Sequence, residues 1–186
     1  WFERYKEGYA VGTQASQSGD VSKRRFVWGA GLGFKKELYL RAYSKCPSFL
    51  SDRYGHLLTS GGDSELCMRM LLLGFNLHYD ERLKFVHYIP QSRLTPEYRD
   101  NLYRSFKESQ LVLSKYAHLL DIREAPFREK VKLFFLSSIR WFFSMLKIST
   151  KWDFSFEATT IYYLTGMRWS RVPYEVRQIY KISSYK

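Results

Sequence analysis

The chain has 186 residues, of which 45% are hydrophobic, 18% aromatic and 26% charged, and its net charge is +12. This composition is that of a globular protein with a sizeable core, and it excludes a disordered or collagen-like chain. The positive charge favours anionic partners, but the sequence holds no zinc finger and no aromatic RNA-binding signature. We therefore expect anionic lipid headgroups or phosphorylated substrates as partners, and no nucleic acid.

The first 43 residues predict a helical start, a loop, a strand and a second helix. Residues 1–5 are amphipathic, and residues 12–19 form a polar loop without apolar periodicity. Residues 25–34 (RFVWGAGLGF) read as a strand in which glycine recurs at every second position. Such a strand has one face without side chains, which has two interpretations. A ligand or another chain segment approaches the backbone closely there, or the glycines mark a bulge or a strand crossing. A short helix is expected over 35–43.

An amphipathic helix is expected over residues 64–73, followed by a glycine stop. Within it, Glu65 and Arg69 stand four positions apart, and we expect them to pair on its outer side. Cys67 falls on the apolar side and reads as a small buried thiol. Residues 75–79 and 83–88 then predict two strands around an acidic turn.

The last third of the chain predicts helices. One opens at Pro96 and runs towards Leu120, and another begins at Pro126. Its apolar centre, residues 133–147, is interrupted by Arg140 and is too short to span a bilayer. Two interpretations stay open: a buried helix of a helical appendage, or an interfacial helix on an anionic membrane. The flanking cations that favour the membrane are Arg128, Lys130, Lys132 and Lys147.

Asp63 and His87 are candidate functional residues, although each also has a purely structural interpretation. An aspartate just before Ser64 is a good helix N-cap, and a histidine after an apolar pair is often a hydrogen-bonded core residue. Alternatively, a carboxylate at a helix entrance is placed to act as a general base. A histidine at a strand end is placed to bind a metal in the same cleft.

Four segments resemble, in order and spacing, the acceptor-side half of bacterial family 2 glycosyltransferases, which have the GT-A fold. They are residues 26–34 (FVWGAGLGF), 60–69 (SGGDSELCMR), 74–82 (GFNLHYDER) and 83–94 (LKFVHYIPQSRL). The resemblance covers roughly residues 1–106. It implies an α/β fold class: a partial GT-A fold that lacks its N-terminal nucleotide-binding half. Residues 107–186, beyond the resemblance, would form a helical, basic C-terminal extension, for which the core and membrane interpretations both stay open.

The resemblance also implies roles for individual residues. Asp63 matches the aspartate that serves as general base, and His87 matches a position that helps to bind the divalent metal or the diphosphate. Gly62 stands where the family usually has the glutamate of an acidic dyad, so this chain departs from the pattern there. The residues implied to contact substrate are Trp28, Gly29, Ala30, Gly62, Glu65 and Arg69.

The activity implied by the resemblance is an inverting sugar transfer from a nucleotide-sugar donor to a glycan or lipid-linked acceptor. The pathway would be cell-surface polysaccharide biosynthesis, with Mn or Mg as cofactor. No Asp-x-Asp metal motif occurs in the chain, and its first residue is Trp1 rather than methionine. We therefore expect a C-terminal portion of a longer enzyme that is inactive alone.

The expected location is the cytoplasm, with peripheral attachment to the inner face of the plasma membrane. Cys46 and Cys67 fit this setting, because they form no CxxC pair or zinc ligand set and require no oxidising compartment. The alternative function is that of a non-catalytic basic module that binds membranes or polyanions.

Overall fold

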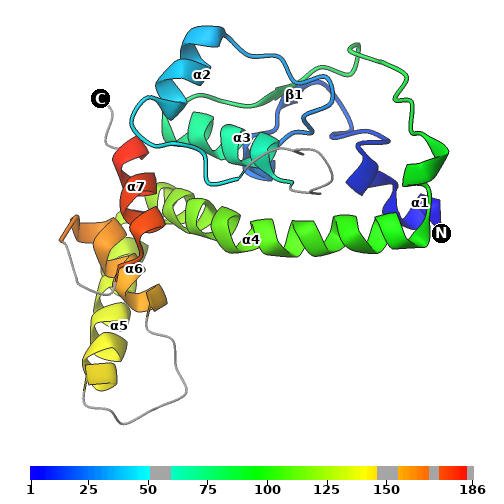
Figure 1. Cartoon of the computed structure of the whole chain (residues 1–186). Coiled ribbons are helices and arrows are strands. Elements are labelled where there is room, and N and C mark those ends of the chain that lie inside the picture. The colour runs from blue at the N-terminus through cyan, green and yellow to red at the C-terminus, as the bar shows by residue number, and fades with distance from the viewer. Residues whose placement is uncertain (51–59, 146–154, 168–171, 184–186) are drawn as a thin grey trace. The chain divides into compact units, whose positions relative to one another are not determined.

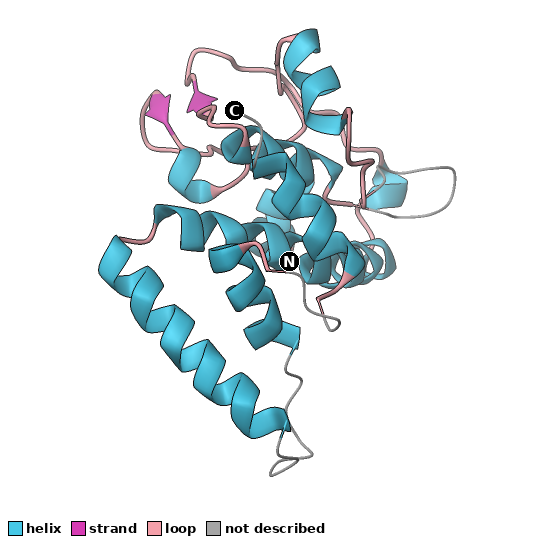
Figure 2. Ribbon diagram, turned by 90° about the vertical axis from the view of Figure 1, so that its left-hand side faces the viewer, coloured by secondary structure: helices cyan, strands magenta, loops and turns pink. Residues whose placement is uncertain are grey.

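The structure, a computed structural model, describes residues 1–50, 60–145, 155–167 and 172–183 (Figure 1). These residues form seven α-helices, three short 3-10 helices and one sheet of two strands. Helices and loops predominate, and the sheet is small (Figure 2). The expected α/β fold class, a partial GT-A fold, is therefore wrong for this chain, which is mostly helical.

The chain divides into two compact units, residues 1–114 and 115–186, and the longest helix belongs to both. That helix is α4 (Pro96–Glu124), with 29 residues. The boundary expected from the sequence, after residue 106, also falls within α4.

The first unit contains three shorter helices, one sheet, the 3-10 helices and the first part of α4. The helices are α1 (Phe2–Tyr5), α2 (Lys36–Tyr43) and α3 (Gly62–Leu72), and the 3-10 helices are Lys6–Tyr9, Ser22–Arg24 and Gln91–Arg93. Strand β1 (Gly19–Asp20) pairs antiparallel with β2 (His78–Tyr79), so that Gly19 faces Tyr79 and Asp20 faces His78. The helices expected near 1–5, 35–43 and 64–73 are thus confirmed.

The strands expected over 25–34 and 83–88 do not form, and only two residues of 75–79 are in a strand. Nevertheless, the close approach indicated by the glycines is present. A Cβ atom at Gly29 would lie 3.2 Å from the Asp63 Cβ, and one at Gly31 would lie 2.9 Å from the Phe85 Cε1. At two of the three glycines, a side chain from another chain segment therefore lies where a Cβ atom would be crowded. Neither a bulge nor a strand crossing is involved.

Helix α3 forms the centre of the first unit. It is buried along six consecutive residues, 65–70, and contributes to two apolar clusters. One cluster joins Cys67 to Val27 and Leu77, and the other joins Leu66 and Met70 to Ala42. The helix ends at Leu72, just before the expected glycine stop. Gly74 has a φ of +90° and donates its N–H to the carbonyl of Leu71 at 3.0 Å.

The second unit contains the end of α4 and helices α5 (Phe127–Met145), α6 (Ser155–Thr165) and α7 (Tyr174–Ser183). Helix α5 packs along α6. The Tyr163 hydroxyl donates to the carbonyl of Lys115 at 3.2 Å, and the His118 Nε2 lies 2.9 Å from the Thr160 Oγ1. Burial lowers the pKa of His118. Among the described residues, no helix has the length and apolar character needed to cross a membrane.

Candidate functional site

The entrance to α3 is built around Gly61, the helix N-cap. Gly61 has a φ of +98°, and its carbonyl accepts the N–H of Glu65 at 2.8 Å. A left-handed conformation of this kind favours glycine. Beside it, the Ser60 Oγ lies 2.9 Å from the Ser105 Oγ of α4, so the entrance is fixed to that helix (Figure 1). Asp63 is the second residue of α3 and does not cap it, so the N-cap interpretation is wrong.

The Asp63 carboxylate joins α3 to the glycine segment. Its Oδ2 accepts the N–H of Gly29 at 2.8 Å, and its Oδ1 accepts the N–H of Ser64 at 2.7 Å. The side chain is half-buried, so it stays accessible to solvent. An ionised carboxylate has about four acceptor positions. The Ser64 hydroxyl also donates to Oδ1, at 3.3 Å. These three donors leave one acceptor position of Asp63, on Oδ2, for a bound hydroxyl group.

Trp28, next to Gly29, is held by two residues that the sequence did not single out. Its backbone N–H donates to the Gln14 Oε1 at 2.6 Å, and the Arg24 guanidinium lies 5.7 Å from its ring centre. Arg24 also lies over the ring of Phe26 and donates to the carbonyl of Gln14 at 2.9 Å. The only sequence signal for this arrangement is the alternation of Arg24, Phe26 and Trp28. Cation–π contacts of this kind orient the indole.

Glu65 and Arg69 form an ion pair in the interior of the first unit. The Arg69 Nη2 lies 2.8 Å from the Glu65 Oε1, and both side chains have no exposed surface. The expectation that the pair lies on the outer side of the helix is therefore wrong. Because α3 is surrounded by protein, the spacing of four residues did not reveal which way the pair faces.

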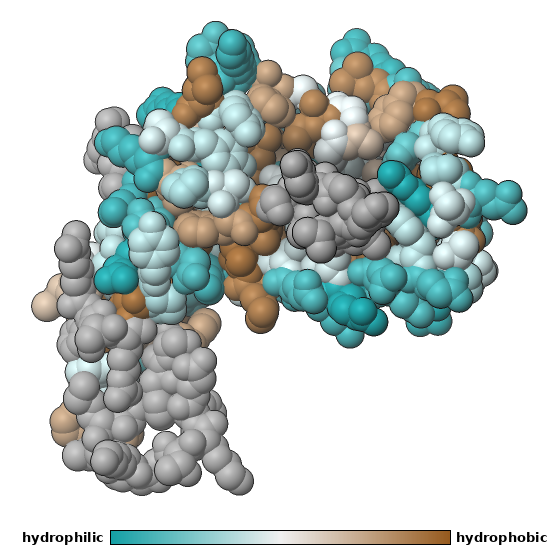
Figure 3. Space-filling view, in the orientation of Figure 1, coloured by the Kyte–Doolittle hydropathy of each residue, from teal (hydrophilic) through white to brown (hydrophobic). Residues whose placement is uncertain are grey.

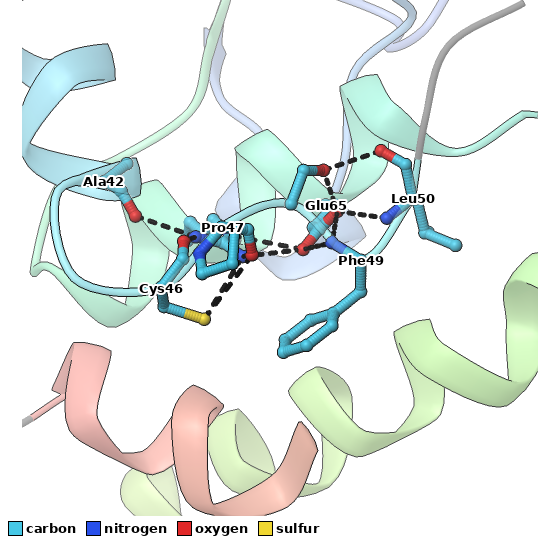
Figure 4. Close-up of polar contacts among 8 residues, drawn as sticks. Ala42, Cys46, Pro47, Phe49, Leu50 and Glu65 are labelled. Carbon is cyan, nitrogen blue, oxygen red and sulfur yellow. Dashed lines mark hydrogen bonds and ion pairs between the residues drawn. The ribbon is translucent and has the colours of Figure 1, made fainter. Parts of the chain in front are cut away.

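This pair holds the loop that follows α2 (Figure 4). Arg69 donates to the carbonyls of Ala42, at 2.9 Å, and Pro47, at 2.6 Å, and also to that of Cys46. Glu65 accepts from the Ser48 hydroxyl and from the N–H groups of Phe49 and Leu50, at 2.7, 3.1 and 2.9 Å. The two residues position the loop, and their predicted contact with substrate stays a prediction.

His87 is exposed, so the interpretation as a core histidine is wrong. It lines an open pocket of about 570 Å³ together with Trp1, Phe2, Val11, Ile89 and Leu94. Asp63 does not line this pocket, and the shared cleft expected for the two residues stays a prediction. Ala30 is half-buried beside Gly29, and Gly62 is the first residue of α3.

A divalent metal requires several protein ligands close together. Among them, no three or more His, Cys, Asp or Glu side chains lie close enough together to hold a metal ion. His87 therefore fits Mn or Mg only as one ligand of a set that the described part of the chain does not complete.

Cys67 does not act as a nucleophile in this structure. Its side chain is buried, as expected, and its Sγ lies 3.9 Å from the carbonyl oxygen of Val27. Burial raises the pKa of the thiol to about 11, so the reactive thiolate is scarce at neutral pH.

Comparisons of the chain with protein-family models, curated proteins and solved structures found no match. Any function inferred for it rests on its own residues and their geometry.

Proposed function

We propose that this chain is the acceptor-side part of an enzyme that transfers a sugar from a nucleotide-sugar donor to a hydroxyl group of a glycan or lipid-linked acceptor. The observation that carries the proposal is the half-buried Asp63 carboxylate, held at the entrance of α3 by the N–H of Gly29, the residue that follows Trp28. The order of motifs from Trp28 to His87, which resembles family 2 glycosyltransferases, supports the same reaction.

In the proposed reaction, the acceptor oxygen attacks the anomeric carbon while Asp63 takes the proton of the acceptor hydroxyl. The bond between the anomeric carbon and the diphosphate oxygen breaks, and the nucleoside diphosphate leaves with the electron pair. A single displacement inverts the anomeric centre. The N–H groups of Gly29 and Ser64 fix the carboxylate, so that its remaining acceptor position faces a bound hydroxyl group.

Asp63→Asn tests the proposal, because an amide no longer accepts a proton. Its single oxygen still accepts the N–H of Gly29, while its NH2 group replaces the oxygen that accepts the N–H of Ser64. In the complete enzyme, the assay measures release of nucleoside diphosphate from a panel of nucleotide sugars with a glycan acceptor mixture. Turnover should fall by at least the ~10²-fold typical of losing a general base, while the thermal unfolding temperature stays unchanged.

Two results would contradict this proposal. If Asp63→Asn keeps normal turnover, the carboxylate only tethers the glycine segment. If no donor in the panel is consumed by the wild-type enzyme, the transferase assignment itself is wrong. Ser64→Ala is a milder variant for comparison, because it removes only the hydroxyl that donates to the Asp63 Oδ1 at 3.3 Å and leaves the carboxylate and both backbone N–H donors in place. It should cost much less turnover than Asp63→Asn.

We also propose that the protein works at the inner face of the plasma membrane, attached to its surface from the cytoplasm. This location is supported by the apolar exposed side of α5 and by the net charge of +12. This location suits an enzyme with a lipid-linked acceptor. A non-catalytic membrane-binding module would have the same location. Asp63→Asn separates the two functions, since such a module has no turnover to lose.

A further inference from the structure

Helix α5 exposes an apolar surface along most of its length. Between residues 133 and 143, six side chains are exposed, and five of them are large and apolar. These five, which we call the α5 face, are Phe135, Leu136, Ile139, Phe142 and Phe143, with exposed fractions of 59, 42, 52, 58 and 53%. The opposite side of α5 packs along α6 and includes the buried Ser137.

Helix α4 shows how a water-facing helix of this chain is normally composed. Its exposed positions between 97 and 110 are all polar or charged: Glu97, Asp100, Asn101, Arg104, Lys107, Glu108 and Gln110. The corresponding surface in Figure 3 is hydrophilic. The α5 face therefore differs from the other long helix in composition, and contiguous apolar patches of this kind mark interaction sites.

The charges of α5 favour an anionic partner. The helix carries four basic residues and one acidic residue, Glu129. At 100° per residue, Arg128 and Lys132 project within the same roughly 120° arc as the α5 face, while Glu129 and Arg140 project roughly 20° and 40° outside it. The Lys132 Nζ lies 3.9 Å from the Glu129 Oε2, so the net charge of this group is positive by two. All three cations are exposed. An arc of this width, rich in phenylalanine and flanked by cations, is typical of helices that lie in the plane of a membrane interface.

We infer that the α5 face is a membrane-binding surface that inserts between anionic phospholipid headgroups, with α5 parallel to the bilayer. The phenylalanine and aliphatic side chains enter the boundary between headgroups and acyl chains, to a depth of about 5–10 Å. Arg128, Lys132 and Arg140 lie at the level of the phosphates. The inference deepens the proposed membrane location and does not depend on the transfer reaction.

Co-flotation of the full chain with vesicles tests the apolar contribution. Wild-type protein should bind vesicles of equal parts phosphatidylcholine and phosphatidylglycerol, and bind pure phosphatidylcholine weakly. The triple variant Phe135→Ser, Ile139→Ser and Phe142→Ser should bind at least tenfold more weakly. The matched control, Leu40→Ser, Leu83→Ser and Leu111→Ser, removes equally exposed apolar residues elsewhere (57, 72 and 71% exposed) and should bind like wild type.

A second pair of variants tests the location of the charge. Arg128→Gln, Lys132→Gln and Arg140→Gln together should weaken binding about tenfold to 100-fold, since each cation near an anionic surface contributes roughly a factor of five. The control, Lys35→Gln, Lys36→Gln and Arg41→Gln at α2, changes the net charge equally and should cost less than threefold. Equal losses in the two variants would overturn the inference, because net charge alone would then explain binding.

A site-specific probe shows whether the helix itself enters the lipid. Cys46 and Cys67 are buried, so an NBD fluorophore attached to Ile139→Cys labels one position. Its emission should shift to the blue and increase on anionic vesicles, while the same label at Leu111→Cys should not respond. No response at residue 139 would overturn the inference.

Two further outcomes decide between occupants and keep this test separate from the catalytic one. If the wild-type chain ignores vesicles but forms oligomers that the serine triple variant abolishes, the α5 face binds a second copy and the inference is wrong. Asp63→Asn should bind vesicles like wild type, so loss of turnover and loss of membrane binding are measured independently. Unchanged thermal unfolding of each variant shows that binding losses do not reflect misfolding.

Discussion

Gly29 and Asp63 are 34 positions apart in the sequence and are joined by one hydrogen bond. The space between them is so small that a residue with a side chain at position 29 would be crowded. The N–H of Gly29 donates to the carboxylate, while the Cα carries no side chain to push it away. A Cβ atom there would lie 3.2 Å from both the Cβ and the Oδ2 of Asp63. The position of the proposed base, the Asp63 carboxylate, therefore depends on the absence of a side chain at residue 29.

Gly29→Ala should consequently lower turnover of the complete enzyme while the protein stays folded. The added methyl group displaces the Asp63 carboxylate, and a displacement of about 1 Å in a catalytic group costs up to ~10²-fold in rate. Gly33→Ala is the matched control, since a Cβ at Gly33 meets nothing within 4 Å. Equal turnover of the two variants would show that the spacing at Gly29 has no functional role.

At the scale of elements, the helices were predictable and the strands were not. The helices over 36–43, 62–72 and 96–124 carry apolar periodicity and clear start or stop residues, which are local signals. A strand requires partners elsewhere in the chain. Residues 83–88 resemble a strand in composition but stay exposed, with 97% of Val86 accessible, because no segment among the described residues forms a strand with them.

The candidate site was predictable to a similar extent. The motif order pointed to Asp63 and to the glycine segment, and these do lie in contact. Gln14 and Arg24 were missed because their contacts with Trp28 depend on how a polar loop folds back. The inward direction of Glu65 and Arg69 was missed because the burial of α3 on all sides is a property of the whole unit.

Helix α3 and the loop after α2 act as one element because Arg69 joins them. Arg69→Met should lower the free energy of unfolding by about 3–5 kcal/mol, since it leaves the buried Glu65 charge uncompensated. Urea denaturation measures the change. Lys6→Met, which breaks the exposed pair between Lys6 and Glu3, is the control and should produce no measurable change.

The double variant Glu65→Gln with Arg69→Met separates charge from hydrogen bonding. Removing both charges should recover only part of the lost stability, because the carbonyls of Ala42, Cys46 and Pro47 have still lost the donors that Arg69 supplied. Full recovery would contradict this account and would mean that the ion pair alone holds the two segments together.

For the whole molecule, the division into two units affects how membrane binding is tested. Deleting residues 121–186 would remove the partners of α4 in the second unit, including Tyr163, whose hydroxyl donates to Lys115, and Thr160 beside His118. Tyr116, Leu119 and Leu120 belong to that unit and are buried in the intact chain. Such a truncation would disturb the fold, so substitutions on the surface of α5 give the clearer result.

The net charge of +12 and the α5 face should contribute to membrane binding in ways that salt separates. The screening length falls from about 10 Å at 0.1 M salt to about 3 Å at 1 M. Vesicle binding by the wild-type chain should therefore weaken at least tenfold over this range. Some binding should persist at 1 M salt, because apolar contact is not screened. The serine triple variant of α5 should lose binding completely at 1 M salt. The glutamine triple variant should bind weakly at both concentrations and respond little to salt. If wild type and the serine variant lose binding alike, the phenylalanine side chains do not enter the lipid and charge alone attaches the protein.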